Sequence, residues 1–495
     1  MALYQLCLLP NLGYSKILQT GQAKSSSLLK TKCSYILSPI QRMAPTVSAH
    51  AIPRRSANFG SSVWDYDFIQ SLTSEFVDNE LYAEQRNQLK EEVRMMLCKT
   101  KNPLFQLELI DDLQRLGLTY HFNNDINTIL DNIYKNMDSF MEENLYFRAK
   151  YHFILELFLN YHLSHKFEVF DCFQDGECDF KESLSFSFDI DGILSLYEAT
   201  FYSLQNEIIL HNATDFCLKH LKEFVKKCGH TELSLLITHA LEIPLHWRMP
   251  RLEAGWFIDF YGRKKSMIHS LLKLAKLDFN MVQTIHQEDL KHASRWWEKA
   301  ALGEKMSFSR DRLVECFIWT VGFSFQPHFG YFRRVMTKVN ALITIIDDVY
   351  DVWDMNAMDT LPEYMKICFL ELYNFVDEFA RDTVKEKGHQ IHPYLAKVCE
   401  METGDITNLI QCYMHKTGAS EAYAREHIKS IICTTWKKIN VDVNSGSYPL
   451  SFIEIAVNVA RMSLCMYQYG DAHSIQDQES KKWISSLLFE AIPIA

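Results

Sequence analysis

Residues 341–354 read ALITIIDDVYDVWD, an apolar stretch that runs into three aspartates. Its first six residues are almost wholly apolar, so a helix formed here must be buried. Residues four apart in a helix lie about 6 Å apart along the axis and on the same side. Asp347 and Asp351 therefore face the same way, whereas Asp348 is rotated by about a quarter turn and can support them only from the side.

Three carboxylates at the C-terminal end of an apolar helix repel one another and oppose the helix dipole. Divalent cations would remove both penalties. Oxygen ligands with room for water suit Mg²⁺ carrying a phosphate, with Mn²⁺ as the alternative. The competing interpretation is a solvated acidic face. The chain offers a comparison at Asp111–Asp112, where Arg115 in the fourth-neighbour position predicts an ordinary salt-bridged surface turn. The apolar lead-in favours metal binding at residues 347–351.

Two arginines, Arg310 and Arg312, precede a second apolar stretch, LVECFIWTVGF at residues 313–323. Their guanidiniums could clamp a departing diphosphate, and Trp319 could offer its π face to a carbocation. For these residues taken alone, a helix start with surface arginines and a core tryptophan explains the pattern better. The pair Trp296–Trp297 is interpreted as packing.

The composition indicates a protein of long helices. At 495 residues the chain is too long for one ordinary core, so two domains are expected. Only 17 glycines and 12 prolines occur, which favours long helices over many strands and tight turns. No apolar run reaches the length of a membrane span. The thirteen cysteines show no metal-binding spacing and are interpreted as small buried hydrophobes in a reducing compartment.

The first 53 residues contain five Lys/Arg, many serines and no Asp or Glu. This composition is typical of an organellar transit peptide, and a disordered basic tail is the alternative. Without those five positive charges the formal net charge of −11 becomes −16. So acidic a body makes a nucleic acid an unsuitable partner. A small anionic ligand would need metal ions or a local arginine cluster.

These segments resemble the plant class I terpene synthases, in particular the plastid monoterpene synthases. The tandem arginines Arg54 and Arg55, followed after eight residues by Trp64, match a motif near the start of the mature enzymes of that family. Further blocks occur in the family's order: LELIDDLQRLGLTYHF (107–122), FSRDRLVECFIW (308–319), FGYFRR (329–334), DDVYD (347–351), NAMDTLPEYMK (356–366), IQCYMHKTGAS (410–420) and YQYGDAH (467–473). Together they cover nearly the whole chain from residue 54.

The resemblance implies an all-α fold, with an N-terminal helical domain at 54–262 and a C-terminal metal-binding bundle at 263–495. It implies a plastid monomer that ionises an allylic diphosphate, geranyl diphosphate in preference to farnesyl diphosphate. Roles carried over by position are Mg²⁺ binding by Asp347 and Asp351 with support from Asp348, diphosphate binding by Arg310 and Arg312, a pocket wall at Trp319, and closure of the site by Arg54 and Arg55.

The second metal cluster of the family is not found in this sequence. Glu400 aligns with its last carboxylate, but His392 and Ala396 occupy the two preceding positions. Two junctions join family blocks directly where family members carry intervening helices: Val352–Trp353, and residues 396–399. We therefore expect this polypeptide to be inactive or severely impaired, and the alternative is a non-catalytic pseudoenzyme or a mis-spliced product.

Two other classes of enzyme fit the sequence less well. A chain-elongating prenyl transferase carries a second aspartate-rich motif of the DDxxD form, and this sequence has none. A class II cyclase needs an Asp-x-Asp-Asp acid in its N-terminal half. The nearest match, Asp189-Ile190-Asp191-Gly192, lacks the last aspartate and predicts a helix start instead.

Overall fold

The part of the chain that the structure describes is built of α-helices and short 3₁₀ turns, without a strand. This computed structural model describes residues 61–77, 79–135, 190–204, 208–229, 231–306, 309–352, 413–414, 417–444, 449–468, 472–473 and 478–494. The all-α prediction is confirmed. Several predicted features lie outside these residues: the transit peptide at 1–53, Arg54, Arg55, Glu400 and the junction at 396–399.

The α-helices follow one another in the order α2 (Tyr66–Ser71), α3 (Glu80–Lys99), α4 (Pro103–Arg115), α5 (Asn123–Lys135), α8 (Ile190–Thr200), α9 (Ile208–Cys228), α10 (Glu232–Glu242), α11 (Pro250–Tyr261), α12 (His269–Ala300), α13 (Leu302–Lys305), α14 (Leu313–Phe323), α15 (Gly330–Val352), α19 (Glu421–Asn444), α20 (Leu450–Tyr467) and α21 (Gln478–Leu488). The 3₁₀ turns are η3 (Thr119–His121), η4 (Leu245–Trp247) and η5 (Pro327–Phe329). Helix α8 includes Ile190, Asp191 and Gly192 of the segment for which a helix start is predicted, and Asp189 lies outside the described residues.

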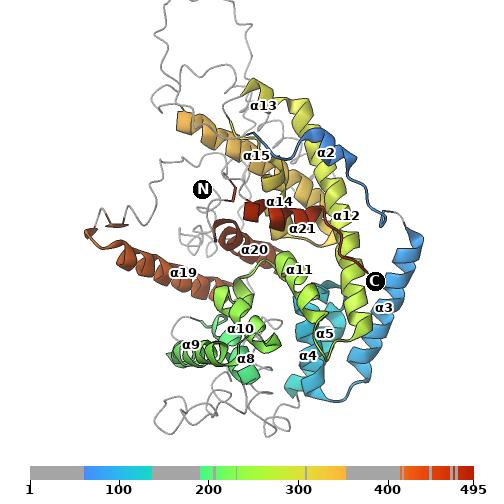
Figure 1. Cartoon of the computed structure of the whole chain (residues 1–495), viewed down its shortest axis with the longest axis vertical. Helices are drawn as coiled ribbons and strands as arrows, with labels where there is room; N and C mark the ends of the chain where they lie inside the picture. The colour runs from blue at the N-terminus through green and yellow to red at the C-terminus, as the bar shows by residue number, and fades with distance from the viewer. Residues whose placement is uncertain are drawn as a thin grey trace, which may run out of the picture.

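Helix α12 is the central packing element of the molecule. It is 32 residues long and packs against α2, α3, α11, α14, α15 and α21 (Figure 1). Leu271, Leu274 and Leu277 repeat at the spacing of a helix face and are each fully buried. One continuous apolar core therefore includes residues of α3 and α4 as well as residues of α14 and α21.

A smaller core lies among α8, α9 and α10, which pack on one another. Helix α10 begins with a reciprocal cap, in which Thr231 Oγ1 accepts from the Ser234 backbone N–H and Ser234 Oγ accepts from the Thr231 N–H. A third cluster connects this region to α19 and α20, since Trp247 of η4 stacks on Trp436 of α19 with ring centroids 5.4 Å apart.

Helix α4 shows why the chain turns where it does. Asn102 caps its first turn by accepting from the Phe105 N–H, and Pro103 occupies the first turn, where its missing N–H costs nothing. The helix is followed by Gly117 with φ +72°, a conformation that glycine adopts without strain. A Cβ added there would lie 3.1 Å from the Ala254 Cβ, so glycine also permits the close approach of α11.

The surface turn predicted at residues 111–115 is wrong. Asp111 and Arg115 do form the expected ion pair, with Arg115 Nε 3.2 Å from Asp111 Oδ1, but their side chains are only 8% and 5% exposed. The apolar spacing of α4 turns this face toward α11, where Arg115 Nη1 also lies 3.6 Å from Glu253 Oε1. Periodicity alone could not reveal this, because the second acid comes from 138 positions further along the chain.

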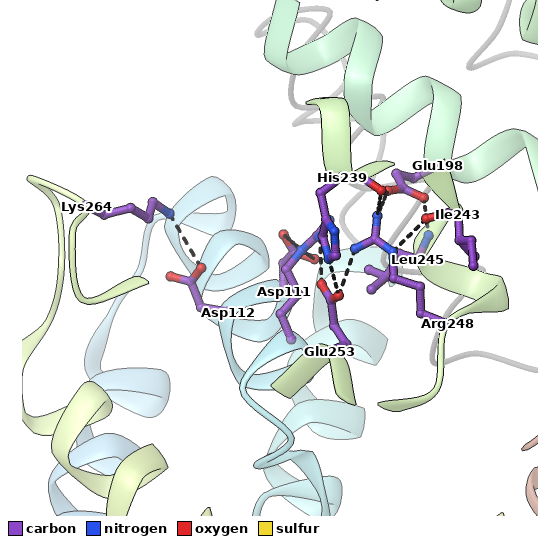
Figure 2. A network of polar contacts seen from close by, with 10 residues as sticks. Asp111, Asp112, Glu198, His239, Ile243, Leu245, Arg248, Glu253 and Lys264 are labelled. Carbon is purple, nitrogen blue, oxygen red and sulfur yellow. Dashed lines mark hydrogen bonds and ion pairs between the residues drawn. The ribbon is translucent and has the colours of Figure 1, made fainter. Parts of the chain in front are cut away.

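Glu253 is the centre of a buried ionic network that joins the two cores (Figure 2). Its Oε2 accepts from Arg248 Nη1 at 2.8 Å and lies 2.9 Å from His239 Nε2. Glu198 of α8 is 1% exposed and accepts from the Leu245 backbone N–H at 2.7 Å. The carboxylates of Glu198 and Glu253 thus face the guanidiniums of Arg115 and Arg248 in the interior, as buried charges must.

Candidate active site

The candidate site is formed where α14 begins and α15 ends. Every residue of α14 is buried, and the helix packs along α15 and α20. Uncharged hydrogen bonds join α14 to α15. Asn340 Nδ2 donates to the Cys316 carbonyl at 3.2 Å, and Thr320 Oγ1 lies 3.4 Å from Thr337 Oγ1. The two helices are antiparallel neighbours, so the start of one meets the end of the other.

The acidic end of α15 contains all three predicted aspartates. Asp347 is half-buried and Asp348 is 1% exposed. Asp351 lies one turn further along the same helix, and its side chain is outside what the structure describes. The helix therefore does carry the carboxylates at the end of a buried apolar stretch, as the sequence predicted, with Leu342 and Ile345 fully buried before them.

Arg310 holds Asp348 from two directions. The backbone N–H of Arg310 donates to Asp348 Oδ2 at 2.6 Å, and its guanidinium Nε lies 2.7 Å from Asp348 Oδ1. Both oxygens of Asp348 are therefore directed at Arg310 in this state. The geometry gives Asp348 the role of a partner that positions Arg310, which agrees with its predicted place beside, and not on, the face of Asp347.

Arg312 and Asp311 complete the start of α14. Arg312 is the N-cap residue, is 3% exposed, and donates from Nη1 to the Asp311 carbonyl at 2.8 Å. Burial raises the pKa of the Asp311 carboxyl, although bonds from the Leu313 N–H and the Trp297 indole oppose the change. Both arginines are thus largely buried, and the interpretation of surface arginines at an ordinary helix start is wrong.

The two neighbouring tryptophans of α12 make different contacts. Trp297 hydrogen-bonds the carboxylate of Asp311, whereas the amine of Lys338 on α15 lies 5.7 Å from the Trp296 ring centroid. Trp296 packs as the sequence suggested. Trp297 also links α12 to the segment that holds the two arginines, a contact that a tryptophan pair in a sequence does not reveal.

Apolar walls extend from this end of α14 toward α20. Trp319 is 3% exposed, with its ring centroid 6.0 Å from Phe323 and 6.3 Å from Tyr467. Burial raises the pKa of the Cys316 thiol to about 12, so this side chain stays neutral. Trp319, Phe323 and Tyr467 form an aromatic cluster between α14 and α20, and aromatic ring faces can stabilise a cation.

Two polar side chains near these walls were not identified as site candidates from the sequence. Thr344 lies on α15, one turn before Asp348, and its Oγ1 is 3.1 Å from His473 Nε2. His473 ends the block YQYGDAH, which was recognised as a family block without a role for any residue. A single threonine within an apolar helix gives no sequence signal, and only the fold brings it to the histidine.

The donors at the end of α15 fit a hard divalent cation. Carboxylate oxygens are the ligands that Mg²⁺ prefers in proteins, and Asp347 and Asp351 stand one turn apart on α15. Across the part of the chain that the structure describes, no cluster of three or more His, Cys, Asp or Glu side chains is arranged to hold a metal. The predicted metal ligand Glu400 lies outside the described residues.

Helices without strands in the described residues, and an aspartate-rich helix end paired with an arginine, are the architecture expected of a metal-dependent helical lyase. The family description "Terpene synthase, N-terminal domain" matches residues 63–241. "Terpene synthase family, metal binding domain" matches residues 298–352 and 352–401, and "Terpene synthase family 2, C-terminal metal binding" matches residues 398–438. The chain belongs to the plant terpene synthase family and is of the monoterpene synthase type.

Three relatives show the extent of the similarity. A chloroplastic myrcene synthase from Quercus ilex is 43% identical over 603 aligned positions, which cover 100% of both chains. The solved structure of limonene synthase with 2-fluorolinalyl diphosphate superposes with a TM-score of 0.82 at 34% identity, covering 89% of this chain and 100% of that chain. Isoprene synthase from grey poplar leaves was solved with three Mg²⁺ ions and dimethylallyl-S-thiolodiphosphate. It superposes with a TM-score of 0.74 at 33% identity, covering 87% of this chain and 99% of that chain.

No described helix combines the length and apolar character that crossing a membrane requires.

Proposed function

We propose that this chain derives from an enzyme that converts geranyl diphosphate into a monoterpene and diphosphate in the plastid. The observation that carries the proposal is the pairing of the acidic end of α15 with Arg310 at the start of α14. Relatives named as chloroplastic monoterpene synthases support the substrate class and the plastid. The basic, serine-rich first 53 residues support the same compartment.

The residues have distinct roles in this reaction. Asp347 and Asp351 would hold Mg²⁺, and the bound ion would neutralise the diphosphate as the allylic C–O bond breaks. Arg310 and Arg312 would bind the released diphosphate with charge-assisted hydrogen bonds. Trp319 would stabilise the allylic cation with its ring face. The buried walls of α14 would exclude water until a proton is lost or water captures the cation.

We further propose that this polypeptide has little or no such activity. The Quercus ilex relative aligns over 603 positions, roughly 108 more than this chain has residues. The metal-binding description matches in two pieces that meet at Val352, and the second C-terminal description starts at residue 398. These two breaks support the proposal that segments are missing after Val352 and near residues 396–399. Half of the carboxylate clamp and part of the bundle wall would be missing.

The test compares the full chain with a version in which the intervening segments of a family member are inserted after Val352 and at residues 396–399. Both proteins are given geranyl diphosphate and Mg²⁺, and the volatiles are identified by gas chromatography and mass spectrometry. We expect product from the restored version only. Equal turnover by the two proteins would refute the impairment, and no product from either would count against the enzyme assignment in favour of a non-catalytic protein.

A further inference from the structure

The last residues of the chain form a short tail, residues 489–494, that follows α21 and lies along α12 (Figure 1). Three buried amide side chains of α12 hold its backbone and that of the end of α21. Asn280 donates to the Ile492 carbonyl and accepts from the Ile492 N–H, both at 2.8 Å. Gln287 donates to the Leu488 carbonyl at 2.8 Å, and Gln283 donates to the carbonyls of Ser486 and Glu490 at 3.2 and 3.1 Å.

These amides lie on one face of α12 and are 1%, 2% and 5% exposed for Asn280, Gln283 and Gln287. A buried amide is costly unless it is hydrogen-bonded, and the hydrogen-bond partners of all three are backbone groups of residues 486–492. The end of a helix does not require so many side-chain hydrogen bonds, so these amides hold the tail in a specific position. It places the side chain of Phe489 at a defined position beside α12.

The N-terminal segment, residues 64–74, is held at two places, one on α12 and one on the tail. Downstream, Gln70 Nε2 donates to Ser294 Oγ at 2.7 Å, and Ser74 Oγ lies 2.6 Å from Thr284 Oγ1. Upstream, the contact is aromatic and is made with the tail: the Phe489 ring centroid lies 5.0 Å from that of Trp64 and 5.2 Å from that of Phe68.

Trp64 depends on this packing. Its indole Nε1 is buried and has no hydrogen-bond acceptor among the described residues, so the ring is fixed by contact and not by a polar bond. The aromatic contacts with Phe68 and Phe489 therefore determine where the upstream end of the segment lies.

We propose that the C-terminal tail positions the N-terminal segment, with Phe489 as the positioning residue. Arg55 is nine residues before Trp64, a tether of at most ~30 Å. Without the aromatic contacts the first anchor is Ile69 of α2, which is 2% exposed, and the tether grows to ~40 Å. The relevance to catalysis rests on the proposed function of the arginine pair. The docking itself involves only described residues and is measured without substrate.

The start of α14, where the candidate active site lies, is close to the stretch of α12 that holds the N-terminal segment. Gln70 Oε1 accepts from Arg295 Nη1 at 3.0 Å, and Trp297, two residues further along α12, hydrogen-bonds Asp311 between the two site arginines. The N-terminal segment is thus anchored on the same stretch of α12 that contacts the candidate active site. By fixing the position of the N-terminal segment, the tail therefore also affects how that segment lies relative to the candidate active site.

The test is hydrogen–deuterium exchange of the full-length chain, read by mass spectrometry. In Phe489→Ala we expect the amides of residues 66–72 to exchange at least tenfold faster, with peptides from α14 and α15 unchanged. Phe489→Tyr keeps the ring and should exchange like the parent chain. Phe452→Ala, which removes an exposed phenylalanine of α20 (57% exposed), is the matched control and should leave residues 66–72 unaffected.

A second variant, Asn280→Ala, keeps the phenylalanine at position 489 but removes the two hydrogen bonds between Asn280 and Ile492 that hold the tail. It should also speed exchange at residues 66–72, and it keeps the proposal testable if Phe489→Ala does not fold. Faster exchange of the tail alone, with residues 66–72 as protected as in the parent chain, would refute the positioning role. Because no diphosphate or metal is used, this result is independent of whether the chain has synthase activity.

Discussion

Replacing Glu253 with glutamine should destabilise the protein by about 3 kcal/mol at neutral pH. The carboxylate is buried between Arg248 and His239, with Arg115 beyond (Figure 2). Burial alone would raise its pKa, but the charge of Arg248, the hydrogen bond from His239 and the more distant Arg115 lower it from 4.5 to about 2. A depression of that size corresponds to roughly 3 kcal/mol at about 1.36 kcal/mol per unit. Breaking a buried ion pair by removing one partner costs about 3–5 kcal/mol.

The pH dependence of this contribution has a definite sign. The folded pKa of Glu253 lies below its ordinary value, so the folded state favours the ionised form. The stabilisation is complete above about pH 4.5 and is lost as the pH falls toward 2. The difference in unfolding free energy between the parent chain and Glu253→Gln should therefore shrink to roughly half by pH 3.

Urea unfolding followed by tryptophan fluorescence provides the assay, because Trp256 stacks on His239 with ring centroids 3.6 Å apart and reports on the network directly. Asp259→Asn is the matched control. Asp259 lies on the same helix as Glu253, pairs with Arg263 and is 71% exposed, so its loss should cost less than about 1 kcal/mol. Equal destabilisation by the two substitutions at pH 7 would refute the argument that burial gives the network its strength.

Three other outcomes follow from the structure. Asp348→Asn should lower the unfolding free energy by about 3 kcal/mol in the same urea assay, because it leaves the largely buried guanidinium of Arg310 without its anion; an unchanged midpoint would contradict the pairing. Gly322→Ala places a Cβ 2.4 Å from Met462 Sδ and should destabilise by about 1–3 kcal/mol, whereas Gly303→Ala, with nothing within 4 Å, should be neutral or stabilising; the reverse order would refute the packing. Mg²⁺ alone should leave the thermal midpoint unchanged and Mg²⁺ with inorganic pyrophosphate should raise it; an equal rise with Mg²⁺ alone would indicate a metal site that needs no anion.

The helices, and which residues share a helix face, could be predicted from the sequence because both depend on residues a few positions apart. The acidic end of α15 follows from five apolar residues and three aspartates within one segment, and its burial follows from the same pattern. The position of Asp348 off the face of Asp347 also follows from helical geometry. The partner of Asp348 does not, because Arg310 is 38 residues away and only the packing of α14 on α15 joins them.

Burial of polar groups was the main source of error. The pattern of residues 111–115 indicates an ion pair correctly, but it cannot show that Glu253 approaches from another helix and turns a surface pair into part of a buried network. The amides of α12 illustrate the same limit. Asn280 and Gln287 are indistinguishable from surface residues in the sequence. They are buried because the C-terminal tail satisfies Asn280 and the end of α21 satisfies Gln287.

The contact between Arg310 and Asp348 depends on α15 and on the residues that lead into α14. Both helices pack on α12, and residues of α12 and α14 belong to the main apolar core that the described residues form. Packing among these helices therefore brings the start of α14 to the end of α15. Under the proposed function, a loss of segments after Val352 would remove ligands for the cations and walls of the pocket. The pairing of Arg310 with Asp348 would remain, because all of its atoms lie before Val352.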